Sequence, residues 1–378
     1  MSKEFIPFTK PYLTGKEIDL VNEAISTLSL VGDGRYTQEA EQIISSLSGN
    51  VEALLTPSCT DALDMSALLL NLEPDDEVII PGFTFTSTAT AFASQKATVV
   101  FADIEPSTLN IDPVSVEKHI TSKTKAIVVV NYAGIACDFD QLLELATQHN
   151  LVLIEDNAHG FGGKFKEQAL GSIGHMGTLS FHATKNIQCG EGGALLTRVD
   201  DYATRAHILR EKGTNRKAFL DGAVDKYTWV DLGSSFLTAD YVAAFLKAQL
   251  ESFDDIQSKR SAVWETYNQE LKSWAKQVGA SLPTIPEYAS HTSHLFWITL
   301  NQAAHRPDFM AHLKDADIGS TFHYQSLAQT PAGQRYGRTL GTPVADFTSD
   351  AIVRLPLYAD MTAQDTARVI DAVLGWKP

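Results

Sequence analysis

Residues 151–160, LVLIEDNAHG, and residues 177–193, GTLSFHATKNIQCGEGG, decide the fold of this chain. Each stretch begins with a short apolar run and then turns polar or glycine-rich, which is typical of a buried strand that ends in a loop. Similar apolar runs precede them in the chain, at residues 52–57, 77–81, 98–103 and 125–131. Helical patterns separate several of these runs, as at residues 61–72 and 138–150. Strands that alternate with helices predict an α/β fold whose mostly parallel sheet is covered on both faces.

The regions after this alternation complete the predicted architecture. Residues 193–198, GALLTR, follow the second stretch closely, so we expect an antiparallel strand there and seven strands in all. A helical pattern over residues 241–275 then leads away from the sheet. We predict a large domain over residues 1–250, with an extended N-terminal arm, and a smaller α+β domain over residues 251–378.

Composition excludes several classes of protein. The chain has 378 residues and a net charge of −16, and a nucleic-acid-binding surface would need a basic field instead. The three cysteines, Cys59, Cys137 and Cys189, have no regular spacing, so neither a disulfide framework nor a metal cluster is predicted. The sequence shows no signal-peptide pattern and no apolar run of membrane-spanning length. We therefore expect a soluble, cytoplasmic protein without membrane or nucleic-acid partners.

Two polar residues follow strands at the edge where parallel sheets bind ligands. Lys185 comes after a strand and before a glycine-rich loop, where a lysine can form a Schiff base with an aldehyde cofactor. Asp156 ends a strongly apolar strand, and its carboxylate can hold a proton on a pyridine nitrogen. Taken singly, Lys185 is more often a surface lysine and Asp156 more often a helix N-cap.

Two earlier loops complete the pattern. Residues 56–63, TPSCTDAL, place Thr60 and Asp61 where a helix begins, which suits either a phosphate or a plain N-cap. Residues 81–89, PGFTFTSTA, offer Phe85 to stack on a pyridine ring, although a phenylalanine is more often part of the core. The order of phosphate turn, aromatic loop, aspartate and lysine favours a pyridoxal-phosphate (PLP) site built across one sheet.

Several long motifs carry a resemblance to a known family, among them TPSCTDAL, PGFTFTSTATAF, LIEDNAHG, SFHATKN, GEGGALL, REKGTNR and RLPLY. With these motifs the chain resembles the DegT/DnrJ/EryC1/StrS aminotransferases over nearly its whole length. The resemblance implies a fold-type I PLP-dependent transferase, similar to aspartate aminotransferase. It also implies catalytic roles for Lys185, as the Schiff-base lysine, and for Asp156, as the partner of the pyridine nitrogen.

The resemblance assigns the remaining cofactor contacts. It implies that Phe85 stacks on the ring, that Thr60, Asp61 and Ser180 meet the phosphate, and that His159 lies near the phenolic oxygen. Many relatives have Asn where this chain has Ser235, which would then approach the partner subunit's phosphate. Further departures from the common pattern are Asn131, Asn157, Ser326 and Ala328. They leave the PLP chemistry intact but bear on the identity of the sugar.

The substrate expectation also comes from the resemblance, which is greatest to a subgroup that serves enterobacterial common antigen. That subgroup moves the amino group of L-glutamate to C4 of dTDP-4-keto-6-deoxy-D-glucose, through pyridoxamine phosphate (PMP), and gives dTDP-4-amino-4,6-dideoxy-D-galactose. Such enzymes are homodimers with active sites at the interface. The candidate contacts to the sugar nucleotide are Lys212, Arg216, Lys226 and Arg354.

The sequence is also compatible with other functions. The same reaction giving the gluco epimer differs only in the face on which C4 is protonated, which a sequence does not reveal. A PMP-dependent sugar dehydrase of the same fold carries His in place of the lysine, so Lys185 argues against it. A PLP-binding regulator is disfavoured by the joint presence of Lys185, Asp156 and Phe85. A nicotinamide dehydrogenase is disfavoured because no G-x-G-x-x-G follows an early strand.

Overall fold

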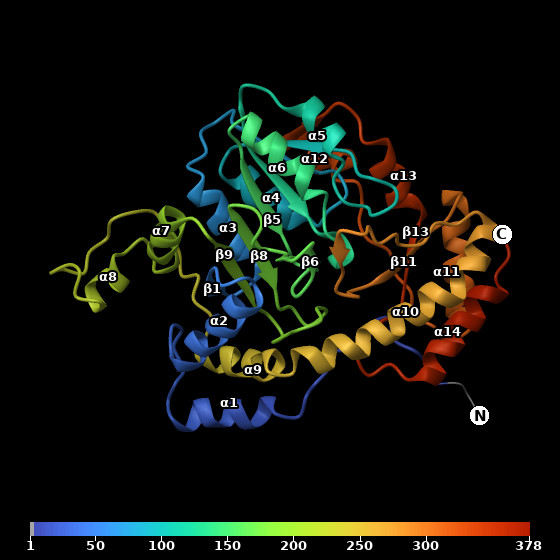
Figure 1. Ribbon diagram of the computed structural model, residues 1–378, viewed down its shortest axis with the longest axis horizontal. Coiled ribbons are helices and arrows are strands. Elements are labelled where there is room, and N and C mark those ends of the chain that lie inside the picture. The colour runs from blue at the N-terminus through green and yellow to red at the C-terminus, as the bar shows by residue number, and fades with distance from the viewer. Residues whose placement is uncertain (1–3) are drawn as a thin grey trace.

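A central sheet of eight strands organises the molecule, shown as a computed structural model in Figure 1, in which residues 4–378 are described. Its strand order is β1-β9-β8-β5-β4-β2-β3-β12. These strands are β1 (Glu52–Thr56), β2 (Glu77–Pro81), β3 (Thr98–Ala102), β4 (Thr124–Val130), β5 (Val152–Asp156), β8 (Met176–Ser180), β9 (Gly193–Thr197) and β12 (Gly337–Thr339). Seven of them coincide with the apolar runs of the sequence, which confirms the α/β prediction.

The directions of the strands match the prediction, but their number does not. Strand β9 runs antiparallel to both of its neighbours, β8 and β1, and the other adjacent pairs are parallel. The prediction of seven strands is wrong by one, because β12 joins the edge of the sheet beside β3. Residues 337–339 read Gly-Arg-Thr, and so short a polar segment carries no strand pattern. The division into domains at residue 250 stays a prediction.

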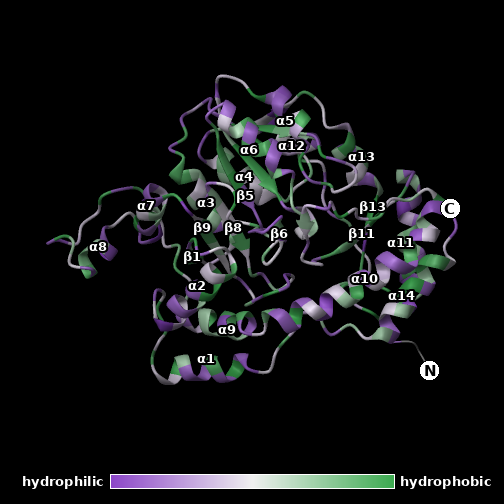
Figure 2. Cartoon of the chain, in the orientation of Figure 1, coloured by the Kyte–Doolittle hydropathy of each residue, from purple (hydrophilic) through white to green (hydrophobic). Residues whose placement is uncertain are grey.

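Helices cover both faces of the sheet, and apolar residues fill its strands (Figure 2). The first helices are α1 (Glu17–Ser26), α2 (Arg35–Leu47), α3 (Cys59–Leu69), α4 (Thr86–Ser94), α5 (Pro113–His119), α6 (Phe139–Gln148), α7 (Asp200–Arg210) and α8 (Arg216–Leu220). Strands β4, β5 and β8 are almost wholly buried, as expected where helices cover a parallel sheet on both sides.

The C-terminal part forms its own apolar cluster around a long helix (Figure 1). Its elements are α9 (Asp240–Leu250), α10 (Phe253–Val278), α11 (Arg306–Asp315), α12 (Pro331–Tyr336), α13 (Pro343–Ala351), α14 (Ala363–Gly375), β10 (Ala289–Ser290), β11 (Phe296–Thr299) and β13 (Ile352–Leu355). The helix predicted over residues 241–275 is therefore two helices, with a break at Glu251 and Ser252. Strands β11 and β13 pair antiparallel, and β6 (Lys164–Phe165) lies between β7 (Gln168–Ala169) and β10 in a small third sheet.

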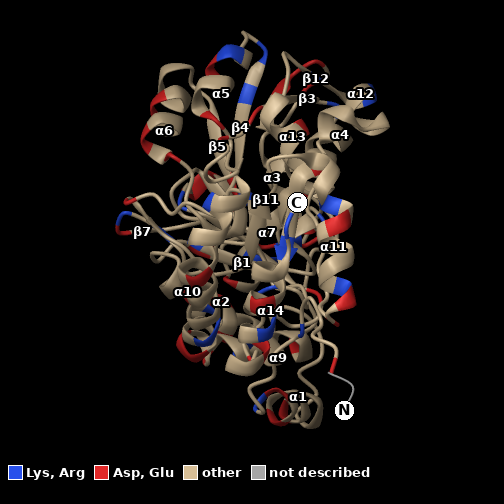
Figure 3. Cartoon of the chain, turned by 90° about the vertical axis from the view of Figure 1, so that its right-hand side faces the viewer, with Lys and Arg blue, Asp and Glu red and all other residues tan. Residues whose placement is uncertain are grey.

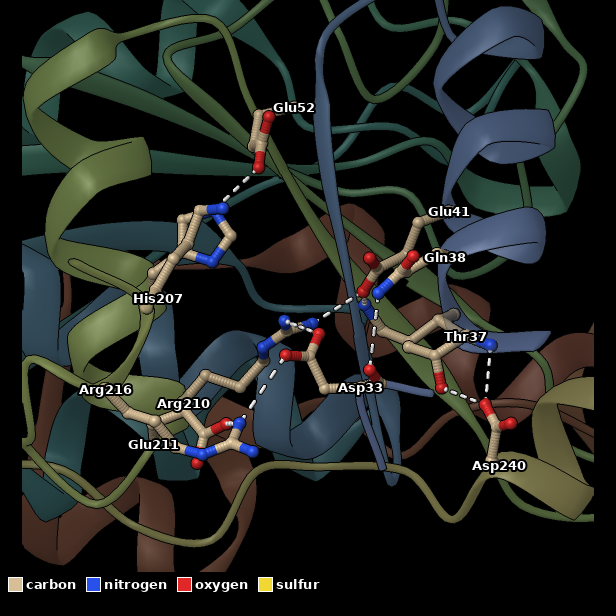
Figure 4. A network of polar contacts seen from close by, with 12 residues as sticks. Asp33, Thr37, Gln38, Glu41, Glu52, His207, Arg210, Glu211, Arg216 and Asp240 are labelled. Atoms are coloured by element: carbon tan, nitrogen blue, oxygen red, sulfur yellow. Dashed lines mark hydrogen bonds and ion pairs between the residues drawn. The ribbon is translucent and has the colours of Figure 1, made fainter. Parts of the chain in front are cut away.

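Charged residues lie mainly on the outer helices, as along α11, where basic and acidic residues alternate (Figure 3). A buried exception joins α7 to the N-terminal part of the chain (Figure 4). Arg210 donates to Glu41 at 2.5 Å and to Asp33 at 2.9 Å. Among residues 4–378, no helix is long and apolar enough to cross a membrane.

Candidate active site

A cavity of about 590 Å³ opens where the parallel strands reach their carboxyl ends, and the C-terminal part closes one side of it. This is the position in which open α/β sheets bind ligands. Seven of the residues predicted as site residues line it: Thr60, Phe85, Asp156, His159, Ser180, Lys185 and Arg354. Lys185 and Asp156 therefore line the same cavity, as the predicted chemistry requires.

The N-termini of α3 and α4, with the side-chain hydroxyls of Ser58, Thr60 and Ser87, form one end of the cavity. Ser58 caps α3 by accepting a hydrogen bond from the N–H of Asp61. The hydroxyl of Thr60 lies 2.8 Å from that of Ser87, in the first turn of α4. Gly193 lets β9 approach this turn, because a Cβ there would lie 2.4 Å from the backbone nitrogen of Cys59. N–H groups in a first helical turn have no intrahelical acceptor, so hydroxyls and helix dipoles together suit a phosphate.

Asp156 lies at the end of β5, buried and held by two donors. The hydroxyl of Thr88 donates to its carboxylate at 2.7 Å, and the N–H of Ala158 donates at 3.2 Å. Burial raises the pKa of Asp156, while these two hydrogen bonds and the nearby charge of Lys185 act to lower it. A cationic pyridine nitrogen at this carboxylate would relieve the cost of burying its charge.

Glu155, the preceding residue, points to the other face of the strand, as the alternation of a strand requires. Its buried carboxylate accepts hydrogen bonds from the N–H groups of Gly171, Ile173 and Gly174 at 2.6 to 2.9 Å. Two adjacent acidic residues thus have separate roles: Glu155 ties the loop before β8 to β5, and Asp156 faces the cavity.

Lys185 lies in the loop between β8 and β9, where its N–H donates to the carbonyl of His182. Burial lowers the pKa of its amine to about 8, against the opposing effects of Cys59 and Asp156. A lysine with such a pKa is partly neutral near physiological pH, which both Schiff-base formation and proton transfer require.

His159 and Phe85 both lie near Tyr324, a cavity residue that was not predicted from the sequence. The N–H of Ala133 donates to Nδ1 of His159, which leaves the proton on Nε2, 3.3 Å from the hydroxyl of Tyr324. Burial lowers the pKa of His159 far below its ordinary value, so the ring is neutral. Phe85 is 55% exposed and presents its ring to the cavity, 6.1 Å from that of Tyr324.

Further cavity residues come from the C-terminal part and were also not predicted. Among them are Arg260, His294, His323 and Tyr324. Ser87, in α4, is another cavity residue that was not predicted. His294 stacks on His159 with ring centroids 4.3 Å apart. His323 and Tyr324 lie in the stretch TFHYQSL, residues 321–327, and no periodicity in this stretch indicates which side chains face the sheet.

Other predicted site residues do not line the cavity. Asp61 lies beside it, where its carboxylate accepts from the hydroxyl of Ser58 at 2.8 Å. Ser235 pairs with Glu211 in an isolated bridge, on a segment that extends away from the body with α8 (Figure 1).

The same segment carries three of the four basic candidates. Lys212 and Lys226 are exposed, and Arg216 donates to Glu211 at 2.8 Å. These three and Ser235 lie outside the cavity of their own chain, so their expected contact with a partner subunit's site stays a prediction.

Comparison with known proteins identifies the family. The model of the DegT/DnrJ/EryC1/StrS aminotransferase family matches residues 11–374. The chain belongs to this family. It is 32% identical to MJ1066, an uncharacterized protein of Methanocaldococcus jannaschii, over 98% of this chain and 97% of that protein.

Solved structures agree with this assignment. The aminotransferase TlmJ from Streptoalloteichus hindustanus superposes with a TM-score of 0.90 at 27% identity, covering 98% of both chains. The putative sugar aminotransferase Spr1654 from Streptococcus pneumoniae, in its PMP form, gives 0.88 at 25% identity, covering 98% of this chain and 96% of that one. The protein is thus a sugar aminotransferase that depends on PLP, and the cavity residues fit this cofactor: a hydroxyl-lined helix terminus for its phosphate, a buried carboxylate, and a lysine of lowered pKa.

Proposed function

We propose that this enzyme transfers the amino group of L-glutamate to C4 of dTDP-4-keto-6-deoxy-D-glucose and gives dTDP-4-amino-4,6-dideoxy-D-galactose. The observation that carries the proposal is that Lys185, Asp156 and Arg354 line one cavity. The exact substrate rests on the resemblance of SFHATKN, REKGTNR and VDKYTW to one subgroup of the family. The balance is one amino group exchanged for one ketone oxygen: glutamate becomes 2-oxoglutarate as the keto sugar becomes an amine.

The residues of the chain divide the work between binding and proton transfer. When bound, PLP supplies an aldehyde carbon that accepts the amino group and a ring that accepts electrons. Asp156 holds a proton on the ring nitrogen, and Thr60 and Ser180 hold the phosphate. The amine of Lys185 holds the aldehyde at rest. It then takes the proton from Cα of glutamate and, in the second half-reaction, delivers a proton to C4 of the sugar.

The sugar nucleotide carries a diphosphate, and three of its four candidate basic contacts, Lys212, Arg216 and Lys226, lie outside the cavity of their own chain. We propose a homodimer in which the segment over residues 211–236 reaches the partner's site. Lys212, Arg216 and Lys226 are on this segment, and so are exposed apolar residues such as Trp229, which is 74% exposed. A protruding segment with both basic and aromatic side chains suits an interface that contacts a nucleotide diphosphate.

Two related reactions are the alternatives to this proposal. Protonation of C4 from the other face gives the gluco epimer, with the same residues in the same roles. A sugar dehydrase working from PMP has no use for a lysine that holds the aldehyde, and the buried setting of Lys185 favours transamination.

One incubation tests the donor, the acceptor and the configuration together. The purified enzyme is mixed with L-glutamate and dTDP-4-keto-6-deoxy-D-glucose, and the product is examined by NMR. We expect an axial amine at C4 and one equivalent of 2-oxoglutarate. An equatorial amine would establish the gluco alternative, and loss of the C3 hydroxyl would establish the dehydrase.

The wider setting follows from the proposed product, which is a building block of surface polysaccharides such as enterobacterial common antigen and O-antigen. We propose a cytoplasmic location for the enzyme. All three cysteines, Cys59, Cys137 and Cys189, are free, which is consistent with a reducing compartment.

A further inference from the structure

The start of α4 and the residues before it are rich in threonine, and these threonines are of two kinds. Residues 84–90 read Thr-Phe-Thr-Ser-Thr-Ala-Thr. Thr84 and Thr88 are buried, whereas Thr86 and Thr90 are exposed. Thr88 lies in the first turn of α4 and Thr84 just precedes that helix, and their hydroxyl oxygens are 2.8 Å apart. The two buried hydroxyls therefore form a hydrogen-bonded pair.

The carboxylate of Asp156 fixes the direction of these hydrogen bonds. Oγ1 of Thr88 lies 2.7 Å from Oδ2 of Asp156. An ionised carboxylate only accepts hydrogen bonds, so Thr88 donates its one hydroxyl proton to Asp156 and accepts from Thr84. The result is a chain in which each hydroxyl donates toward the carboxylate. Thr84 and Asp156 also line the cavity, so both ends of the chain lie at its wall.

The hydrogen bond of Thr88 differs from those of other helical threonines. A threonine inside a helix can donate to the backbone carbonyl four residues earlier. Thr266 in α10 and Thr366 in α14 do so, at 2.7 and 2.9 Å. Thr88 donates instead to a residue at the end of β5, 68 positions further along the chain. Its hydroxyl thus serves the carboxylate and not the helix.

The neighbouring acid shows how few donors Asp156 has. The buried carboxylate of Glu155 accepts four hydrogen bonds, three from backbone N–H groups and one from the amide of Asn131. Within residues 4–378, the carboxylate of Asp156, which is also buried, accepts two, from Thr88 and from the N–H of Ala158. A carboxylate can accept about four, so Asp156 keeps room for a cation. Because its donors are few, each has a large effect on its affinity for a proton.

Hydrogen bonds to an ionised carboxylate lower its affinity for a proton. Burial raises the pKa of Asp156, and the hydrogen bond from Thr88 opposes this more strongly than the N–H of Ala158 or the charge of Lys185 does. Hydrogen bonds in a chain polarise one another, so the donation from Thr84 makes Thr88 a better donor. Without the two hydroxyls, the carboxylate would compete for the proton that the ring nitrogen of the cofactor is expected to carry.

We propose that Thr84 and Thr88 act together as positioning residues: they hold Asp156 ionised, so that the proton between Asp156 and the cofactor stays on the ring nitrogen. The inference rests on the role proposed for Asp156, and it does not depend on the identity of the sugar or of the amino donor. A protonated ring accepts electrons better than a neutral one. The two hydroxyls therefore support the reactivity of the cofactor without taking part in proton transfer to the substrates.

The test compares PMP with its 1-deaza analogue, in which a C–H group replaces the ring nitrogen. Both compounds have the phosphate, and neither has an aldehyde that could bond to Lys185, so equilibrium dialysis measures their binding without turnover. The ratio of the two dissociation constants reports the contact between Asp156 and the nitrogen. We expect cofactor-free wild-type enzyme to prefer PMP about 100-fold, and Asp156→Asn to lose most of this preference.

The threonine variants then test the chain. Thr88→Val keeps the shape but not the hydroxyl and should lower the preference for PMP about tenfold, and Thr84→Val, one bond further from the carboxylate, should lower it about threefold. Thr88→Ser and Thr84→Ser keep the hydroxyl and should restore the preference. Thr90→Val is the matched control, because Thr90 is exposed on the same helix and should leave the ratio unchanged.

A double variant adds a check on the mechanism. Thr84→Val combined with Asp156→Asn should show the same ratio as Asp156→Asn alone, because the hydroxyl then has no carboxylate to act on. A further loss in the double variant would mean that Thr84 acts independently of Asp156, and would overturn the inference.

The remaining outcomes separate the inference from the proposal on which it rests. If both valine variants weaken the binding of PMP and of the analogue by the same factor, the hydroxyls only support the cavity wall and the inference is overturned. If wild-type enzyme prefers PMP, Asp156→Asn does not, and both valine variants keep the wild-type ratio, the role of Asp156 stands and the inference alone fails. Equal binding of the two compounds by wild-type enzyme would remove the role of Asp156 and the inference with it. A variant that binds the analogue as wild type does is folded, so a changed ratio does not report unfolding.

Discussion

Replacing Lys185 with Met removes an amine whose charge the fold disfavours, and we expect this change to abolish turnover but to stabilise the cofactor-free protein. Burial holds the pKa of Lys185 at about 8, below the ordinary 10.5. A group with a lowered pKa in the folded state costs stability as the pH falls through that range. The cost is about 3 kcal/mol at pH 7 and about 1.4 kcal/mol at pH 9.5, at roughly 1.36 kcal/mol for each tenfold change.

The assay is denaturant unfolding of both proteins, stripped of cofactor, at pH 7 and pH 9.5. The Met variant should exceed wild type in free energy of unfolding at pH 7, and the advantage should be about halved at pH 9.5. Lys272→Met is the control, because Lys272 is exposed on α10 and should show little effect at either pH. A variant less stable than wild type at pH 7, or an advantage that does not change with pH, would refute the reasoning.

Three further perturbations test the surroundings of the site. Asp156→Asn removes the carboxylate that we expect to hold the proton on the ring nitrogen, and it should lower kcat at least about 100-fold in steady-state kinetics. Thr88→Val removes one hydrogen bond to the carboxylate of Asp156 and should lower kcat about tenfold in the same assay. Glu155→Gln perturbs four buried hydrogen bonds, three from backbone N–H groups and one from the side chain of Asn131, and should lower the free energy of unfolding by about 2 kcal/mol in denaturant titrations. An unchanged value would contradict the role assigned to Glu155. Arg210→Met leaves Glu41 buried without its partner and should cost about 3–5 kcal/mol by the same measurement, with no change in kcat for the protein that remains folded.

The sequence predicted the strands well because burial on both faces leaves continuous apolar runs, as in β4 and β5. The positions of Lys185 and Asp156 at the cavity were predictable because Asp156 ends such a run and Lys185 follows one, and strand ends meet at one edge of a sheet. The break between α9 and α10 was not predictable, because Glu251 and Ser252 contain neither the Gly nor the Pro that usually marks the end of a helix.

The wall of the cavity formed by the C-terminal part was only partly predictable. His323 and Tyr324 come from an irregular loop, and tertiary packing alone brings them to the sheet. Arg354 was singled out as a cation, but a sequence does not show that a buried guanidinium lacks an acidic partner. That property appears only when all neighbouring elements are in place.

The pairing of β12 with β3 has a consequence for how the chain can be divided. Residues 337–339 pair with the edge strand β3 of the main sheet, although they follow α9 and α10 in the chain by many residues. A fragment ending near residue 250 would retain the other seven strands yet present bare N–H and C=O groups along β3. An unpaired edge strand of this kind can pair with the edge strand of another chain. A shortened form should therefore self-associate, and adding the tail in trans as a peptide that includes residues 331–342 should suppress the aggregation.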